Sequence, residues 1–178
     1  MNRSFGRACR WFLAPIVLGL SAPMASAYPD KPISLIVPFA EMGQGALTGI
    51  AMLVAEELEV EPESIRLEIA PGDDKLYGHP LFGDQITGGS ASIPGGWTSM
   101  RRAGAAARIM LIAAAAKRGS VPASSCHAEK GVVVHAASGR RLAYGALVDA
   151  ARLQPVPQEP MLRTAGLKVI GKPLRRLD

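Results

Sequence analysis

Cysteine and histidine are scarce in this chain. Of its 178 residues, only Cys9 and Cys126 are cysteine, and three are histidine. Two cysteines allow at most one disulfide, so a fold held together by several disulfides is excluded. The histidines are isolated in the sequence and lack the spacing of a structural zinc site, so we predict no metal ligands. His127 follows Cys126, but neighbouring side chains on a strand point to opposite faces. We therefore predict no catalytic residue there or elsewhere.

Aromatic residues and an excess of charge are also lacking. Aromatic side chains make up 5% of the chain, whereas 48% is hydrophobic and 20% is charged. This balance is normal for a globular domain and argues against disorder. The formal net charge is +5, but Arg3, Arg7 and Arg10 all lie in the first ten residues. The remainder is nearly neutral and has no basic stripe, so we predict no nucleic-acid partner.

Residues 1–27 have the three parts of a secretory signal. Three arginines form a positive start, an apolar run at 11–20 is too short to span a bilayer, and an A-x-A cleavage site ends at Ala27. We expect cleavage after Ala27 and a mature protein that is periplasmic or secreted. Because no later run reaches the length of a membrane span, we predict no transmembrane segment.

The rest of the chain predicts an α+β (α/β) fold, in which a mixed sheet is packed by an alanine-rich helix. Compact β-rich runs predict strands, and apolar residues at three- and four-residue spacings predict helices. The predicted strands are 33–37, 65–69, 126–129, 132–136 and 141–144, and the predicted helices are 48–58, 97–117 and 145–153. Residues 71–96 form a long glycine-rich loop, which we expect to be ordered because it contains apolar and aromatic side chains.

Two glycine-rich runs have the greatest chemical specificity, Gly43-Gln44-Gly45 and Thr87-Gly88-Gly89-Ser90-Ala91-Ser92. Glycine lets a backbone approach a phosphate or a flat cofactor closely, and a helix N-terminus presents unpaired N–H groups. The Gln44 amide both donates and accepts, and the hydroxyl and N–H groups of the second run suit phosphate oxygens. The first run is not a dinucleotide motif, because Thr48 stands where a third glycine is needed. Taken alone, either run is more often a simple turn or loop.

The start of the mature chain has a resemblance of its own. Residues 28–40 resemble the start of periplasmic solute-binding proteins of the tripartite tricarboxylate transporter type. In that family a Pro-Gly-Gly loop that touches a carboxylate ligand would come next, whereas here Glu41-Met42-Gly43 follows. The resemblance ends at Ala40 and implies a join between two unlike sequences at Ala40/Glu41.

Six short motifs follow one another after that point. They are E-M-G-Q-G-A-L-T at 41–48, L-V-A-E-E-L at 53–58, D-D-K-L-Y at 73–77, Q-I-T-G-G-S at 85–90, A-G-A-A-A-R at 103–108 and I-G-K-P-L at 170–174. In this order they resemble the molybdopterin-binding large subunit of the xanthine oxidase and aldehyde oxidase family, in its branch of isoquinoline 1-oxidoreductase β-subunits. On this basis we expect a signal peptide at 1–27, a partial molybdopterin-binding domain at 28–153, and a proline-rich connector to a further domain at 154–178.

The resemblance implies a molybdenum hydroxylase, which hydroxylates a carbon of an N-heterocycle or an aldehyde with water as the oxygen source. It implies molybdopterin in its cytosine dinucleotide form as the cofactor. It also implies two partners, an iron–sulfur small subunit and the remainder of the large subunit. By the same analogy the molybdopterin is lined by Gly43, Gln44, Gly45 and Thr48, and its phosphate end is held by Gly88, Gly89, Ser90, Ala91 and Ser92.

Two departures from the family pattern bear on activity. Pro94 stands where the branch usually has an arginine, which weakens the holding of an anion. The late G-x-G-E motif that carries the family's general base does not occur in this sequence, and in the family pattern Glu41 is a structural neighbour of the cofactor loop. We therefore predict a truncated binding domain that is inactive alone. The alternatives are a remnant of a carboxylate-binding periplasmic protein and a non-functional product of gene fusion.

Overall fold

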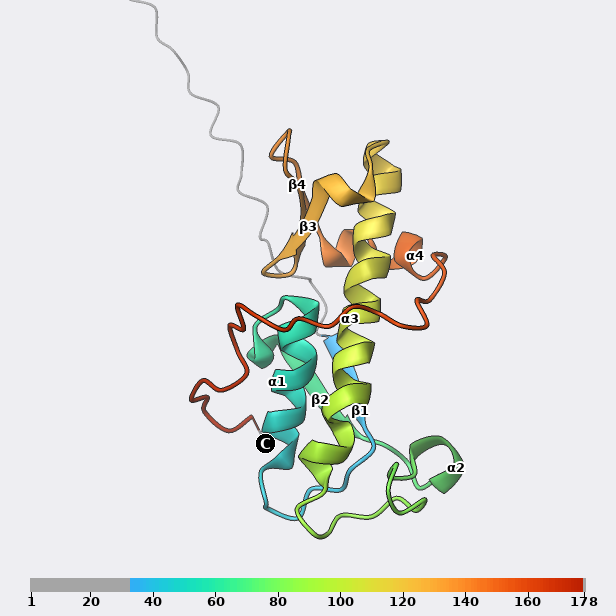
Figure 1. The fold of residues 1–178 in the computed structure, drawn as a ribbon, viewed down its shortest axis with the longest axis vertical. Coiled ribbons are helices and arrows are strands. Elements are labelled where there is room, and N and C mark those ends of the chain that lie inside the picture. The colour runs from blue at the N-terminus through green and yellow to red at the C-terminus, as the bar shows by residue number, and fades with distance from the viewer. Residues whose placement is uncertain (1–32, 178) are drawn as a thin grey trace, which may run out of the picture.

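In the computed structural model the described residues are 33–177, so the predicted signal peptide at 1–27 lies outside them. The elements follow the order β1, α1, β2, α2, α3, β3, β4, β5 and α4, with short 3₁₀ turns between some of them (Figure 1). No helix in this part of the chain is both long enough and apolar enough to cross a membrane.

The first part of the described chain is a β–α–β unit. β1 (Ile33–Val37) and β2 (Ile65–Ile69) pair in parallel, with Ile33 opposite Ile65. They are connected by α1 (Ala46–Leu58) and the 3₁₀ turn η1 (Pro62–Ser64). Parallel strands need such a crossover, because the chain has to return to the same end of the sheet. Both strands lie where the sequence predicts them, and the glycine-rich run at 43–45 leads directly into α1.

The segment predicted as a long loop at 71–96 contains helical structure. It holds the short helix α2 (Asp74–Tyr77) and the first turn of α3 (Ser92–Gly119), a helix of 28 residues that begins at Ser92 rather than at residue 97. Pro94 is tolerated because it lies in the first turn, where its missing N–H has no partner within a helix. Gly95 packs against a buried ring, since a Cβ added to Gly95 would lie 2.2 Å from Nε2 of His79.

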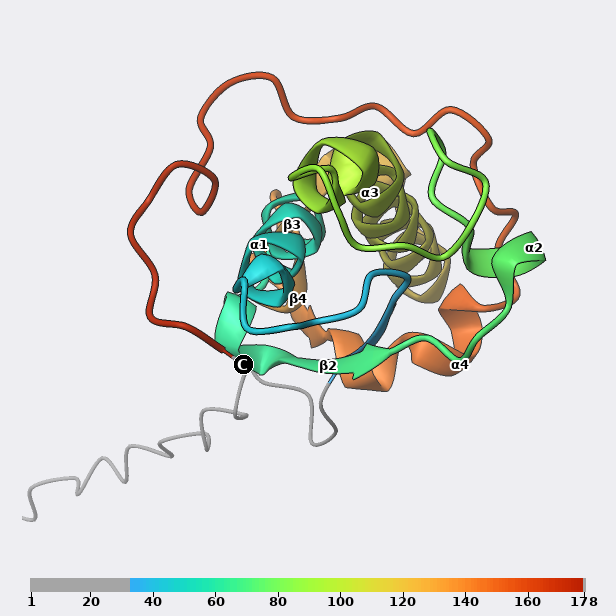
Figure 2. The ribbon, with the colours of Figure 1, turned by 90° about the horizontal axis from the view of Figure 1, so that it is seen from below.

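The long helix α3 packs along α1 (Figures 1 and 2). Gly104 allows this close approach, because a Cβ added there would lie 2.7 Å from the carbonyl oxygen of Val54. Alanines fill the buried side of α3, as its composition predicts, and Ala105 is fully buried. The small side chains on this face of α3 therefore allow α1 and α3 to pack closely.

A second, antiparallel sheet lies at the far end of α3. It contains β3 (Cys126–Glu129), β4 (Val132–His135) and β5 (Arg141–Ala143) in that order, preceded by η2 (Ala123–Ser125) and followed by η3 (Tyr144–Ala146) and α4 (Val148–Ala151). The α+β class is confirmed, but the strands form two separate sheets instead of one mixed sheet. The first sheet packs on α1, whereas β3 and β4 of the second sheet pack on α3.

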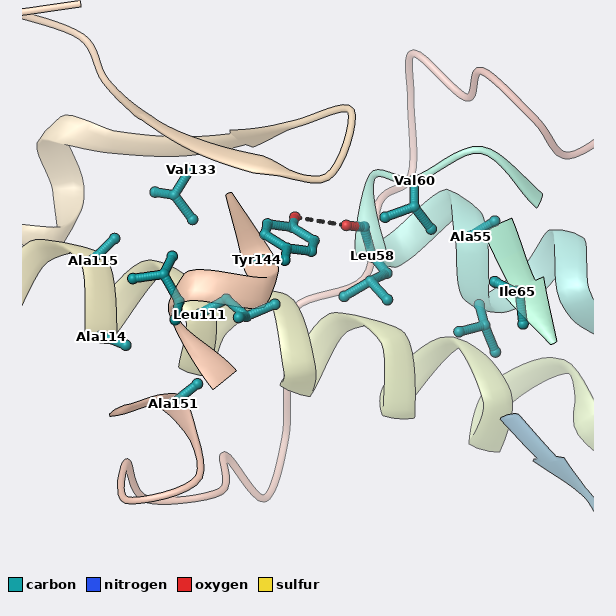
Figure 3. Close-up of a cluster of buried hydrophobic side chains, with 12 residues drawn as sticks. Ala55, Leu58, Val60, Ile65, Leu111, Ala114, Ala115, Val133, Tyr144 and Ala151 are labelled. Carbon is teal, nitrogen blue, oxygen red and sulfur yellow. Dashed lines mark hydrogen bonds between the residues drawn. The ribbon is translucent and has the colours of Figure 1, made fainter. Parts of the chain in front are cut away.

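A cluster of buried side chains joins α1, α3 and the second sheet (Figure 3). Val133 of β4 and Leu147 are almost completely buried in it. Tyr144 donates a hydrogen bond from its hydroxyl to the carbonyl oxygen of Leu58, at 2.8 Å, where α1 ends. Burial raises the pKa of the Tyr144 hydroxyl, and the nearby charge of Arg108 opposes this only in part. Tyr144 therefore remains neutral and ties the two halves of the fold together.

The segment after α4 is irregular and runs back across α3 and α1, so that the last described residues lie beside the first turns of α1 (Figures 1 and 2). Two glutamates of α1, Glu56 and Glu57, hold this segment there by accepting hydrogen bonds from its backbone. The Glu56 carboxylate accepts hydrogen bonds from the backbone N–H groups of Lys168, Val169 and Ile170, at 2.7–3.0 Å. The extended character of this segment agrees with the sequence, and its role as a connector stays a prediction.

Candidate functional site

The first glycine-rich loop is organised around the carboxylate of Glu41. Its Oε1 atom accepts hydrogen bonds from the N–H groups of Gly43, at 2.8 Å, and Gly45, at 2.9 Å. Its Oε2 atom accepts from the N–H group of Leu47, at 3.3 Å, inside the first turn of α1. Glu41 therefore occupies one N–H group in the first turn of α1, that of Leu47, and the N–H groups of Gly43 and Gly45 just before the helix, so these three are not available to a ligand.

The side chain of Gln44 closes the same loop. Its Oε1 atom accepts from the N–H group of Met42, at 2.6 Å, and its Nε2 atom donates to the carbonyl oxygen of Ala40, at 2.9 Å. The amide was predicted to be available to a ligand, but its oxygen and nitrogen both bind the backbone of its own loop. Gln44 therefore shapes the loop and contributes surface to it.

The second glycine-rich loop lies against the first. Thr87 donates a hydrogen bond from Oγ1 to the carbonyl oxygen of Ala40, at 3.0 Å. Gly89 and Ser90 both have left-handed backbone conformations, with φ of 57° and 56°. Within residues 33–177 the N–H groups of Gly88, Gly89 and Ser90 have no hydrogen-bond partner. The second loop therefore offers the donors that the first one lacks, next to the N-terminus of α3.

His79 contacts the backbone of the second loop. Nothing in the sequence indicated this role, because no other histidine or cysteine lies near His79 in the sequence. The ring is 3% exposed and lies between the rings of Phe39 and Phe82. Its Nδ1 atom accepts from the N–H group of Leu81, and its Nε2 atom lies 3.1 Å from the carbonyl oxygen of Ala91. Because Nδ1 accepts a hydrogen bond, Nε2 is the donor, and the ring holds the backbone just before α3.

A cavity of about 390 Å³ lies between the two loops. Both loops are at the lower end of α1 and α3 in Figure 1. Of the nine predicted cofactor-binding residues, the five that line the cavity are Gln44, Gly45, Gly88, Ser90 and Ser92. The other lining residues are Met42, Ala46, Gly49, Thr87 and Ile93. The tertiary structure thus brings together two runs that are far apart in the sequence.

The other four predicted residues have different positions. Gly43, Gly89 and Ala91 belong to the two loops but do not line the cavity. Thr48 is buried inside α1, and its Oγ1 atom accepts a hydrogen bond from the N–H group of Leu177, at 3.0 Å. Thr48 therefore contacts the end of the chain instead of the cavity.

Among residues 33–177 no group of three or more histidine, cysteine or acidic side chains is close enough to hold a metal ion. His135 contacts the hydroxyl of Ser138, and Cys126 pairs in β3 opposite His135. His127, which follows Cys126, lies opposite Val134 in the same sheet. The chemistry available at the cavity is therefore that of glycine backbone and hydroxyl groups.

Comparison with known proteins agrees with this description. The chain matches the model of the molybdopterin cofactor-binding domain over residues 3–170. It is 42% identical over 122 residues to isoquinoline 1-oxidoreductase subunit beta of Brevundimonas diminuta, an alignment that covers 68% of this chain and 16% of that protein. It is 26% identical over 164 residues to the membrane-bound aldehyde dehydrogenase [pyrroloquinoline-quinone] of Gluconacetobacter polyoxogenes, covering 84% of this chain and 20% of that protein.

These matches establish the family. The chain belongs to the molybdopterin-binding proteins of the xanthine oxidase family, as the motifs between Glu41 and Asp178 predict. It spans one fifth or less of the length of these curated relatives. The match to the family model begins at residue 3, so it includes the segment that resembles a solute-binding protein and marks no boundary at Ala40.

The residues around the cavity fit a molybdopterin. An added Cβ at Gly88 would meet no atom within 4 Å, so the backbone there opens onto free space. The unpartnered N–H groups of the second loop and the hydroxyls of Ser90 and Ser92 are donors suited to phosphate oxygens. Gly45 on the opposite wall has no side chain, and a Cβ added there would meet only Arg176 within 4 Å. The two walls therefore offer donors on one side and close approach on the other.

Proposed function

We propose that this chain is the part of a molybdenum hydroxylase-type oxidoreductase that binds molybdopterin, and that the cofactor occupies the cavity between the two glycine-rich loops. One observation carries this proposal. Two loops that are far apart in the sequence meet at the carbonyl of Ala40 and enclose a cavity of about 390 Å³. Family membership supports the same cofactor.

Each wall of the cavity has its own task in this proposal. The N–H groups of Gly88 and Ser90, with the hydroxyls of Ser90 and Ser92, bind the phosphate end of the cytosine dinucleotide form. Gly45 lets the flat part of the cofactor approach the backbone. Glu41 and His79 touch the loops instead of the cavity, and they keep each loop in its conformation.

When bound, the cofactor supplies the molybdenum chemistry that hydroxylates a carbon of an N-heterocycle or an aldehyde, with oxygen from water. The residues of this chain bind and orient that cofactor. None of the side chains that line the cavity is a carboxylate or a histidine, so we propose that a general base comes from a segment outside these residues. The chain alone is then inactive, and an iron–sulfur subunit is the expected electron acceptor.

A reconstitution experiment tests this proposal. The full chain is incubated with molybdopterin cytosine dinucleotide, passed over a gel-filtration column and assayed for molybdenum and for oxidation of an N-heterocycle. We expect close to one molybdenum per chain and no oxidation. Oxidation by the chain alone would refute the proposed inactivity. Loss of all molybdenum, together with a rise in melting temperature with dicarboxylates, would favour a carboxylate-binding protein instead.

We further propose that the chain is exported, on the signal-like sequence at residues 1–27. Expression of the full chain in a bacterial host, followed by fractionation and N-terminal sequencing, tests this directly. The expected result is a periplasmic protein that begins at Tyr28. A cytoplasmic protein that keeps residue 1 would contradict it.

A further inference from the structure

We propose that β2 is an interaction surface, and that its free edge pairs in an antiparallel direction with β2 of a second copy of this chain. The first sheet consists of the parallel strands β1 and β2, and within residues 33–177 no third strand joins it. An open edge leaves backbone N–H and C=O groups unpaired, which makes it a template for a strand of another chain. No residue of β2 lines the cofactor cavity, so this inference is independent of the proposed function.

The backbone hydrogen bonds show which residues of β2 face the free edge. The N–H group of Ala70 donates to the carbonyl oxygen of Val37, at 2.8 Å, so Ala70 faces β1. Successive residues of a strand direct their backbone groups to opposite sides, so Ile69, Leu67 and Ile65 face away from β1. The N–H group of Ile65 already donates to the turn before the strand. The free edge therefore presents both backbone groups of Leu67 and Ile69 and the carbonyl of Ile65.

Pairing centred on Leu67 satisfies these groups with two-fold symmetry. In an antiparallel pair, two directly opposite residues can exchange both of their N–H···O bonds. Leu67 exchanges these bonds with Leu67 of the second copy, and the N–H group of Ile69 donates to the carbonyl of Ile65 of the second copy. The side chain of Ile69, which is 52% exposed, then packs beside that Ile65. A symmetric dimer requires a self-complementary contact of this kind.

The charges on the outer face of β2 favour a second copy as the partner. Arg66 and Glu68 flank Leu67, and their side chains are 68% and 46% exposed. In the register centred on Leu67, Arg66 lies opposite Glu68 of the second copy, and Glu68 lies opposite Arg66 of the second copy. Opposite charges at directly opposed positions stabilise a strand pair, whereas like charges destabilise it. β1 contains no charged residue, so the other strand of this sheet offers no comparable pattern.

The surroundings of β2 agree with a reversible dimer. Figure 2 shows β2 near the lower margin of the fold, with α1 and α3 above it. Ser34 donates from Oγ to Oε1 of Glu68, at 3.3 Å, and so keeps this carboxylate on the outer face of the sheet. The strand is five residues long, so the contact is small, and small interfaces give weak complexes. We therefore expect dimers to form as the protein concentration rises.

Sedimentation velocity of the full chain over a range of concentrations tests this proposal. Arg66→Glu places acidic residues opposite acidic residues in both cross-strand pairs, and Glu68→Arg places basic residues opposite basic residues. Each variant should raise the dissociation constant of the dimer about tenfold or more, because both pairs become repulsive. Glu129→Arg is the matched control, because it reverses an exposed glutamate that pairs with Arg141 in the second sheet. Its dissociation constant should equal that of the unmodified chain.

Mixing the two variants separates strand pairing from a general loss of stability. An equimolar mixture of Arg66→Glu and Glu68→Arg should recover the dimer, because each acidic strand then lies opposite a basic strand. The chain that carries both substitutions should also dimerise, since its charges are exchanged but still complementary. A chain that stays monomeric at its highest soluble concentration would overturn the proposal and leave the edge to a strand of a different protein. A dimer that survives both single substitutions would place the contact elsewhere and overturn it as well.

Discussion

Thr87 and Ala40 are joined by a hydrogen bond of 3.0 Å although 47 positions separate them in the sequence. The same carbonyl oxygen of Ala40 accepts from Nε2 of Gln44, so one acceptor holds both glycine-rich loops. Neither loop makes a cavity by itself. We expect the width of the candidate cofactor site to depend on this shared contact.

Thr87→Val should therefore widen the site at little cost in stability. One partly exposed hydrogen bond contributes about 0.5–1.5 kcal/mol, and Ala40 keeps its bond from Gln44. We expect weaker cofactor retention, measured as molybdenum per chain after gel filtration, with only a small fall in the urea midpoint. Thr98→Val, on an exposed position of α3, is the control. Unchanged retention in Thr87→Val would show that the contact does not set the site.

Gly88→Val should block the cavity without disturbing the fold. A Cβ at Gly88 meets no protein atom within 4 Å, so the larger side chain enters the free space that we assign to the ligand. We expect cofactor retention to fall at least tenfold, with the melting temperature of the unloaded chain unchanged. Gly72→Val is the matched control, because Gly72 also has no neighbour within 4 Å and does not line the cavity. Full retention in Gly88→Val would place the cofactor elsewhere.

Glu57→Ala should destabilise the fold strongly. Glu57 is completely buried and accepts from Nε and Nη2 of Arg101, at 2.9 and 2.6 Å, and from the backbone N–H group of Arg163. Its removal leaves the buried guanidinium of Arg101 without its carboxylate, which costs about 3–5 kcal/mol. Urea denaturation measures the loss, and Glu63→Ala on an exposed position should change stability by no more than about 0.5 kcal/mol. Similar stability in the two variants would contradict this role.

Glu56 should make the attachment of the chain end sensitive to acid. Burial raises the pKa of its carboxyl, but hydrogen bonds from the N–H groups of Lys168, Ile170 and Val169 and the charge of Arg163 outweigh burial. The folded-state pKa is therefore below the ordinary value of 4.5. A group with a lowered pKa in the folded state stabilises the fold fully above its unfolded pKa, and this contribution is lost as the pH falls through the folded pKa.

We therefore expect the melting temperature of the unmodified chain to fall as the pH is lowered from about 5 toward 3. Glu56→Gln should be less stable at neutral pH and should show a smaller fall over the same range. Hydrogen exchange at residues 168–170 reports the local attachment, and it should accelerate in Glu56→Gln at neutral pH. Glu63→Gln serves as the exposed control. Identical pH profiles for the unmodified chain and Glu56→Gln would rule out this linkage.

Gly104→Ala should destabilise the chain although alanine is the better helix former. Alanine gains about 1 kcal/mol in intrinsic helix propensity, but its Cβ would lie 2.7 Å from the carbonyl oxygen of Val54. Separating two packed helices to relieve such an overlap costs about 1–3 kcal/mol. We expect a net loss in urea denaturation. A gain in stability would mean that α1 and α3 are not in close contact at this point.

Much of the local structure follows from local sequence. The apolar run at 33–37 forms β1, and the spacing of Ile50, Leu53 and Val54 buries one face of α1. The alanine-rich run forms the long helix α3, with its predicted start misplaced. That start was missed because proline and glycine usually end helices. Here Pro94 lies in the first turn, and Gly95 is required by contact with His79, which no local pattern reveals.

Contacts across long sequence distances decided the rest. The sequence by itself determined the family and paired the two glycine-rich runs in function, because the order of the motifs and the spacing of the glycines can be read directly from it. Only the tertiary structure showed that Thr48 contacts Leu177 and that Arg176 reaches Gly45. The segment that carries Leu177 and Arg176 is held against α1 because the buried Glu56 and Glu57 accept hydrogen bonds from its backbone, more than a hundred residues away in the sequence.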